Sequence, residues 1–370
     1  MLNSALKTLS TPFPHPDAYT TEALRSKVAP MPSSIEDVAR RANVSISTVS
    51  RVINRRELVN VKTRERVEEA IRELRYRPNA FARGLMLRKS GIVGLVLPDL
   101  HGEFYSEIIR GANLQAREVG TNLLLSSALP GDDAQRWLAA LGQRALLDGL
   151  AVMVSDTMAS GIGPALAELQ LPIVVLDGEI DGVEHDTVVI DQRQGALAMM
   201  QHLLDDCAMQ RIIFVGGLKT NIDTQARYKA YCDALKSADR KVDTLDVYYL
   251  DYSYESAYRL ANSKVRDWAG ADTCVFAAND EMAAGIIAGA IAHDVAVPED
   301  LAVVGFDDTR VAQMTKPLLT TVRVPMSNMG ATAIDLLCQR ITEPEREATT
   351  VSLPPELIIR DSSGNGREAS

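Results

Sequence analysis

The sequence predicts an α/β protein with a small N-terminal bundle of three helices and a longer, two-lobed body built on parallel sheets. Residues 34–75 contain three short segments whose apolar positions recur at helical spacing. From residue 91 onward, apolar runs that end in Asp, Gly or Ser alternate with amphipathic segments, which is typical of parallel sheets covered by helices. The chain has 370 residues and 46% hydrophobic content, enough for two or three domains with substantial cores.

The first two helices of the bundle are predicted from their capping residues. Ser34 can cap the first helix, and Asp37, three residues later, completes a capping-box pattern. A turn over residues 41–44 follows. Ser45 can then cap a second helix over residues 46–53, because its hydroxyl can accept a hydrogen bond from a backbone N–H in the first turn.

The second helix has an inward and an outward face. Val49, Val52 and Ile53 recur at the spacing of a buried stripe. The residues left facing outward are small and polar, with one arginine: Ser47, Thr48, Ser50 and Arg51. A third helix over residues 63–75 closes the bundle. Two short helices around a tight turn, the second carrying small polar groups and an arginine, form a geometry that enters a DNA major groove.

The charge of the chain is distributed unevenly. Residues 32–90 hold 14 Lys and Arg against 7 Asp and Glu, a net charge of +7. The remainder carries −17, so the whole chain has a net charge of −10. A basic head can neutralise DNA phosphates while an acidic body is repelled by them, so the charge predicts nucleic-acid contacts at one end only.

The body of the chain is predicted to contain two sheets of roughly six strands each, and hence two lobes. A helix is expected over residues 104–119. Buried strands are expected over residues 91–100, 121–126, 149–155, 172–178, 186–191, 211–217, 243–251, 273–280 and 301–308. Polar residues gather after these strands, at the carboxyl ends where open α/β sheets bind ligands.

Two segments resemble a known family. DVARRANVSISTVSRVIN, residues 37–54, is similar to the helix-turn-helix of lac-repressor-type (LacI/GalR) transcription regulators. YRPNAFARGL, residues 76–85, resembles the hinge helix of that family. The resemblance extends over residues 33–362 and implies a DNA-binding bundle and hinge helix before a two-lobed, periplasmic-binding-protein-like core.

Five regions are expected from the patterns and the resemblance together. Residues 1–31 form a disordered extension, or an untranslated leader if translation starts at Met31. The remaining regions are the helix-turn-helix domain over 32–77, the hinge helix and linker over 78–90, the effector-binding and dimerisation core over 91–362, and a disordered tail over 363–370.

The resemblance implies which side chains contact DNA. Ile46, Ser47 and Arg51 occupy the base-reading positions, and a guanidinium can donate two hydrogen bonds to guanine. The implied phosphate contacts are Ser50, Asn54, Asn60, Thr63 and Tyr76. Tyr76 can also pack its ring in the core. In the hinge, Asn79 caps the helix, Arg83 follows the phosphates or the groove, and Leu85 is the apolar wedge at a minor-groove step, or alternatively a core leucine.

The resemblance also implies an effector pocket between the lobes. The matched positions are Phe104, Tyr105, Arg227, Tyr252, Asn279, Asp280 and Asp307. The aromatic faces suit a sugar or a flat ring, Arg227 reaches polar ligand groups, and the carboxylates accept hydrogen bonds from hydroxyls. Asp280 has an alternative role as a cap of the helix that follows it.

The predicted function is that of a homodimeric repressor that binds a near-palindromic, double-stranded DNA operator under the control of a small effector. A sugar or sugar derivative is the first candidate effector. The alternative effector is a purine or another flat ring that acts as a corepressor. A more distant alternative is a solute-binding protein with no role on DNA.

Other classes of protein fit less well. The dinucleotide-binding fingerprint fails, because Gly161 and Gly163 continue to Leu166 where the third glycine is needed. The four cysteines and five histidines show no metal-ligand spacing, so we expect no catalytic site, cofactor or metal. No apolar run approaches the ~20 residues that span a bilayer. We therefore expect a cytoplasmic protein without membrane contacts.

Overall fold

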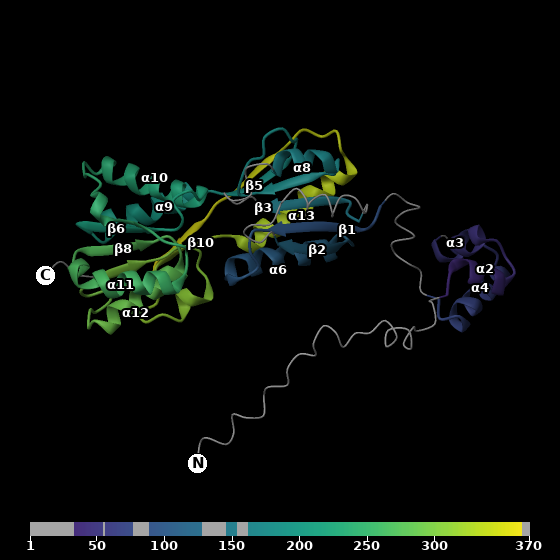
Figure 1. The fold of residues 1–370 in the computed structure, drawn as a ribbon, viewed down its shortest axis with the longest axis horizontal. Helices are drawn as coiled ribbons and strands as arrows, with labels where there is room; N and C mark the ends of the chain where they lie inside the picture. The colour runs from purple at the N-terminus through teal and green to yellow at the C-terminus, as the bar shows by residue number, and fades with distance from the viewer. Residues whose placement is uncertain (1–32, 55, 77–88, 128–145, 154–161, 365–370) are drawn as a thin grey trace, which may run out of the picture. The chain divides into compact units, whose positions relative to one another are not determined.

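The computed structural model describes residues 33–54, 56–76, 89–127, 146–153 and 162–364, which form two compact units (Figure 1). The helical unit lies within residues 1–83, and the core unit lies within residues 84–370. The expected extension over residues 1–31 is outside the described residues. So are hinge residues Asn79, Arg83 and Leu85.

The helical unit is the expected three-helix bundle. Its elements are α2 (Ile35–Ala42), α3 (Ile46–Asn54), the 3-10 helix η2 (Arg56–Leu58) and α4 (Val61–Glu73). The capping box is confirmed, because the Asp37 N–H donates to Ser34 Oγ at 3.2 Å and the Ser34 N–H donates to Asp37 Oδ2 at 2.9 Å. The hydrogen bonds that the Asp37 carboxylate accepts from the Ser34 N–H and from the Ser34 hydroxyl lower the pKa of Asp37. The Thr48 N–H donates to Ser45 Oγ at 3.2 Å, as expected for the second cap.

The third helix begins two residues earlier than predicted. Asn60 is its N-cap, with Oδ1 accepting a hydrogen bond from the Thr63 N–H at 2.9 Å. The helix therefore covers Val61–Glu73, where the apolar spacing alone predicted residues 63–75. Val67 and Ala70 pack from this helix against Val38, Val49 and Val52 to form the core of the bundle.

The first lobe of the core unit holds a sheet of six strands, the predicted number, but its sixth strand, β11, was not among the predicted segments. Its strands are β1 (Ile92–Leu97), β2 (Asn122–Ser127), β3 (Gly149–Met153), β4 (Ile173–Leu176), β5 (Asp186–Ile190) and β11 (Thr350–Leu353). They pair in the order β11-β5-β4-β3-β1-β2, and every pair is parallel.

Helices cover both faces of this sheet. Along β1, Leu95 packs with α6 (Gly102–Glu118) and α13 (Met326–Thr342), whereas Val96 packs with α8 (Ile162–Leu169). The strand therefore buries alternate side chains in two different clusters, as a strand with both faces covered must. Helix α6 begins two residues before the predicted start at Phe104.

The second lobe departs from the predicted six strands. Its parallel sheet has four described strands in the order β7-β6-β8-β9: β6 (Arg211–Gly216), β7 (Val247–Tyr249), β8 (Thr273–Ala277) and β9 (Ala302–Val304). The strands β10 (Thr321–Arg323) and β12 (Glu356–Ile358) pair with each other in an antiparallel ribbon. The other edge of β10 forms isolated parallel bridges with the end of β9 and the segment after it, where the Gly305 N–H donates to the Thr320 carbonyl at 2.9 Å and the Asp307 N–H donates to the Val322 carbonyl at 2.8 Å.

Helices also cover both faces of the second sheet. Phe214 of β6 packs with α9 (Gln192–Gln201) and α10 (Ile222–Ser237). Val215 packs on the other face with α11 (Tyr254–Trp268) and α12 (Asp280–Ala292). The remaining short helices are η3 (His202–Asp206), η4 (Thr244–Asp246), η5 (Arg310–Gln313) and η6 (Asp361–Ser363). No described helix combines the length and apolar character required to cross a membrane.

The expected tail begins too early at residue 363. Ser362 and Ser363 lie in η6 and are fully buried. Ser362 Oγ donates to the Val303 carbonyl at 2.6 Å, and Ser363 Oγ lies 3.0 Å from His202 Nε2. These polar partners come from segments far away in the sequence, so the local composition gave no sign that the two serines pack in the second lobe.

Candidate DNA-binding surface and effector pocket

The outward face of α3 is exposed as the apolar pattern predicts. Val49 and Val52 are buried, which turns Ser47 and Arg51 to solvent. Ile46 at the start of the helix is 44% exposed, so its aliphatic side chain is accessible on the same face. The exposed face can therefore offer an apolar contact, a hydroxyl and a guanidinium to a partner.

Several expected phosphate-contacting residues lie beside this face. Arg51, Asn60 and Thr63 border one shallow depression where α3 approaches the start of α4. The N-terminus of a 13-residue helix such as α4 carries a partial positive charge and unpaired N–H groups, which favour an anion. Ser50 is half-buried on the same helix as Arg51.

Two further residues of this set have constraints of their own. The ring of Tyr76 packs against the bundle core, and burial raises the pKa of Tyr76. The sequence allows this packing of the ring, and it is compatible with a contact between the Tyr76 hydroxyl and a phosphate. Asn54 ends α3, and its side chain is outside the described residues.

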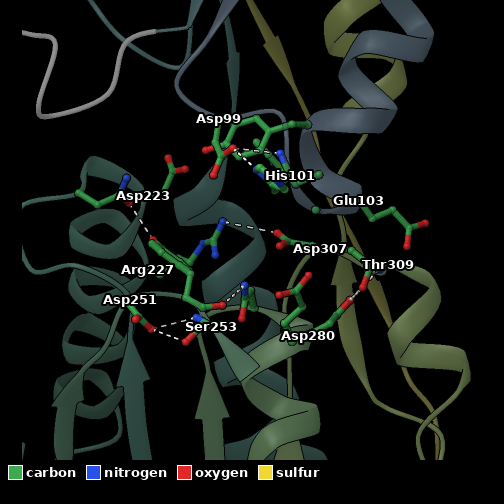
Figure 2. A pocket seen from close by; sticks show the side chains of 17 residues that line it. Asp99, His101, Glu103, Asp223, Arg227, Asp251, Ser253, Asp280, Asp307 and Thr309 are labelled. Carbon is green, nitrogen blue, oxygen red and sulfur yellow. Dashed lines mark hydrogen bonds and ion pairs between the residues drawn. The ribbon is translucent and has the colours of Figure 1, made fainter. Parts of the chain in front are cut away.

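The core unit contains a cavity of about 450 Å³ between its lobes (Figure 2). All seven predicted effector residues line it: Phe104, Tyr105, Arg227, Tyr252, Asn279, Asp280 and Asp307. The two aromatic residues Phe104 and Tyr105 come from α6 of the first lobe, and the others come from the second lobe. Its volume suits a small molecule.

Arg227 is held rigidly in the wall of the cavity. Its Nε and Nη2 atoms donate to Gln192 Oε1 at 3.1 and 2.8 Å, and Nη1 donates to the Ala278 carbonyl. Its guanidinium carbon lies 3.8 Å from the centre of the Phe306 ring. Asp307 Oδ1 is 3.7 Å from Nη2 (Figure 2). Most of the donors of Arg227 are therefore used inside the protein.

Asp307 has unused hydrogen-bonding capacity. Its Oδ1 atom is buried and accepts no hydrogen bond from any described residue. Burial raises the pKa of Asp307, and the charge of Arg227 opposes that effect. The backbone of Asp307 has a φ of 109°, a strained conformation for a residue with a side chain. A ligand hydroxyl could supply the missing donor.

Asp280 and Asn279 use their polar atoms within the protein. Asp280 Oδ2 accepts from the Thr309 N–H at 2.7 Å, and Oδ1 accepts from Thr321 Oγ1 at 2.5 Å. Burial raises the pKa of Asp280 to about 7. Asn279 is the N-cap of α12, through a bond from the Met282 N–H at 2.9 Å. The alternative role of Asp280 as the cap is therefore wrong.

Tyr252 is held in the wall of the cavity by hydrogen bonds within the second lobe. Its hydroxyl donates to Asn221 Oδ1 at 2.8 Å and lies 2.6 Å from Thr224 Oγ1. Burial raises its pKa to about 12. Gly217 lies so close to the ring that a Cβ atom there would be 2.1 Å from it. The hydroxyl is thus held by two hydrogen-bonding partners, and the backbone at Gly217 packs directly against the ring.

Sequence reasoning did not predict ten other residues of the lining: Asp99, His101, Gly102, Glu103, Asn221, Asp223, Asp251, Ser253, Glu281 and Thr309. A signal for several of them was present. Asp99 and Asp251 follow strands, and Glu103 and Glu281 lie in the first turns of the helices that come next. Such positions meet at the carboxyl edge of a parallel sheet.

Comparison with known proteins identifies the family. Residues 34–79 match the family model for bacterial regulatory proteins of the lacI family, and residues 200–363 match a periplasmic binding protein-like domain. Catabolite control protein A of Priestia megaterium is 34% identical over 333 residues, covering 89% of this chain and 99% of that protein. The HTH-type transcriptional repressor PurR of Klebsiella pneumoniae is 31% identical over 335 residues, covering 90% and 98%.

Solved structures agree with this assignment. The lac repressor dimer bound to operator and the anti-inducer ONPF has a TM-score of 0.78 and 25% identity, covering 90% of this chain and 99% of its own. The complex of the transcriptional regulator CelR with cellobiose has a TM-score of 0.67 and 30% identity, covering 89% and 99%. The matches span both the DNA-binding segment and the core, which a solute-binding protein with no role on DNA would not require. The chain belongs to the LacI family of bacterial transcriptional regulators.

Proposed function

We propose that this protein is a homodimeric repressor that binds a near-palindromic operator and changes its operator affinity when a small molecule occupies the pocket between the lobes. The observation that carries the proposal is the pairing of an exposed face on α3 with a cavity lined by charged and aromatic side chains in one LacI-family chain. Because the DNA target lies in the cytoplasm, the protein acts there.

Base recognition falls to the exposed face of α3. Arg51 donates two hydrogen bonds to a guanine. The phosphate contacts come from Ser50, Asn54, Asn60, Thr63 and Tyr76. They fix the register of the bundle on the duplex without reading sequence.

Dimerisation and the hinge complete the mechanism. One bundle reads one half-site, so a near-palindromic operator requires two chains related by twofold symmetry. Asn79, Arg83 and Leu85 belong to the hinge, with Leu85 as the wedge in the minor groove. Closure of the lobes on the effector changes the separation of the two hinges and so the affinity for DNA.

The effector is a sugar or a sugar derivative. Asp307 offers an unused acceptor, and the aromatic rings of Phe104 and Tyr252 can cover the face of a pyranose. The related CelR structure contains cellobiose, and a LacI-family regulator from Enterococcus faecium contains ribose. A purine or another flat ring is the second candidate, favoured by the same aromatic rings.

Selection of bound sequences from random duplex DNA tests the proposal. We expect an enriched site with twofold symmetry and an affinity that falls steeply as salt rises, because bound phosphates release counterions. Light scattering should give the mass of a dimer. Failure to enrich any sequence, or a stable monomer, would show that the proposal is wrong.

A further inference from the structure

The pocket is strongly acidic. Among the described residues that line it, seven carry carboxyl groups: Asp99, Glu103, Asp223, Asp251, Asp280, Glu281 and Asp307. Among the same described lining residues, Arg227 carries a positive charge, and His101 carries one when it is protonated. Arg227 already donates to Gln192 and to the Ala278 carbonyl, so few of its N–H groups remain to bind an anionic ligand.

Glu281 is a half-buried carboxylate with neither a hydrogen bond nor an ion pair among the described residues. It extends from α12 of the second lobe toward the first, because its Oε1 lies 3.8 Å from the position that a Cβ on Gly102 would occupy. Burial raises the pKa of Glu281, and the nearby charges of Glu255 and Glu103 raise it further. An ionised carboxylate that is half-buried without a counter-charge is energetically unfavourable, and a bound cation would stabilise it.

The neighbouring Glu103 is only partly neutralised. Its carboxylate accepts a hydrogen bond from the Arg310 N–H at 2.8 Å and lies 3.7 Å from Arg310 Nε. The Arg310 side chain is 80% exposed, so solvent weakens this pair. Glu103 and Glu281 therefore make one end of the pocket negative, whereas Asp307 offers a hydrogen-bond acceptor in its wall.

We propose that the ligand of this pocket carries a protonated amine on a hydroxyl-bearing frame, as an amino sugar or an amino nucleoside does, and that phosphorylated compounds are excluded. The amine pairs with Glu281 and Glu103, and a hydroxyl donates to Asp307 Oδ1. The inference deepens the proposed function, since it names the chemical class of the effector.

Charge distinguishes this class from the other candidates. A neutral sugar satisfies Asp307 but leaves Glu281 without a counter-charge. A phosphate would add about two negative charges to a lining that already has an excess of acidic groups. Three of the five N–H groups of Arg227 already donate within the protein, so this residue offers a phosphate few hydrogen bonds. The Coulomb energy between unit charges in a partly buried site is large enough to decide between these ligands.

Isothermal titration of the full-length protein tests the inference. The first probes are glucosamine, galactosamine and mannosamine, each with its N-acetyl and 6-phosphate forms. The second set is 3′-amino-3′-deoxyadenosine with adenosine and adenosine 5′-monophosphate. We expect at least one amine to bind about tenfold or more tightly than its neutral counterpart, with an affinity that falls as salt rises. Binding of the phosphate forms should be undetectable.

A pair of variants locates the effect. Glu281→Gln keeps the side-chain size. We expect it to lower the affinity for the amine about tenfold and to change the affinity for the neutral form little. Glu118→Gln removes the same charge at the other end of α6, about 22 Å from Glu103 along the helix, and should change neither affinity. Circular dichroism melting checks that both variants fold.

Each of three results would overturn the inference: no amine in either set binds, a neutral or phosphorylated member binds most tightly, or Glu281→Gln weakens amine and neutral forms equally. Operator selection without any ligand is measured separately. A protein that selects an operator but prefers a neutral ligand retains the proposed function and loses only this inference.

Discussion

Arg227 and Asp307 face each other at 3.7 Å in the wall of the inter-lobe pocket, yet their hydrogen bonding differs. Arg227 donates to Gln192 and to the Ala278 carbonyl, whereas Asp307 Oδ1 accepts no hydrogen bond from the described residues. Arg227 therefore acts as a brace that holds Asp307 in place, and Asp307 is the member of the pair with capacity left for a ligand.

Asp307→Asn should abolish the response of the protein to its effector, because an amide presents a weaker acceptor than a carboxylate and breaks the ion pair with Arg227. Operator binding without effector should persist, since the bundle and the pocket belong to different units. Gel shifts with and without the amine probes check this, with the exposed Asp267→Asn as the control. An unchanged response in Asp307→Asn would remove the residue from the site.

Arg51→Ala should reduce the preference for the operator over unrelated DNA by about 1–3 kcal/mol, because a bidentate contact to guanine is lost. Weak binding to any DNA should remain, since the phosphate contacts are retained. Competition gel shifts with operator and scrambled duplexes measure the ratio of the affinities for the two DNAs. If the ratio is unchanged, Arg51 does not read a base.

Asp280 should make the protein less stable as the pH rises from about 4 to about 7. Burial raises its folded-state pKa to about 7 from the ordinary value of 3.8. In this window the unfolded chain has lost the proton and the folded chain still holds it, so the free energy of unfolding decreases with pH.

Melting experiments on wild type and Asp280→Asn check this effect, since the variant cannot titrate at this position. The wild type should lose stability relative to the variant over that pH range, on the order of a few kcal/mol. Parallel stability curves for the two proteins would contradict the raised pKa. Other buried carboxylates, such as Asp177, contribute equally to both proteins and cancel in the comparison.

Gly330→Ala should destabilise the first lobe, because α13 packs directly on α6 at this point. A Cβ on Gly330 would lie 2.0 Å from the Ile108 carbonyl oxygen, so the helices would have to separate. A loss of about 1–3 kcal/mol or more is expected for such overpacking. Asn328→Ala, at an exposed position of the same helix, should remain within about 0.5 kcal/mol of wild type. Equal unfolding curves for the two variants would refute the close contact.

The sequence by itself determined the local elements and the family. The capping box of Ser34 and Asp37, the buried stripe of α3 and the alternation of buried strands with helices in the core depend on interactions within a few residues or on a regular period, so pattern reasoning finds them. The resemblance of residues 37–54 to a helix-turn-helix then selected the positions to examine in the core.

The tertiary structure decided what no local pattern contains. The β10–β12 ribbon, the burial of Ser363 and the approach of the Glu281 carboxylate to Gly102 depend on segments that are tens to hundreds of residues apart in the chain. Arg227 and Asp307 were both predicted, but their unequal hydrogen bonding follows from Gln192 and Ala278. The physical reason is that a buried polar group is defined by which partners packing brings to it, and packing joins residues irrespective of their separation in sequence.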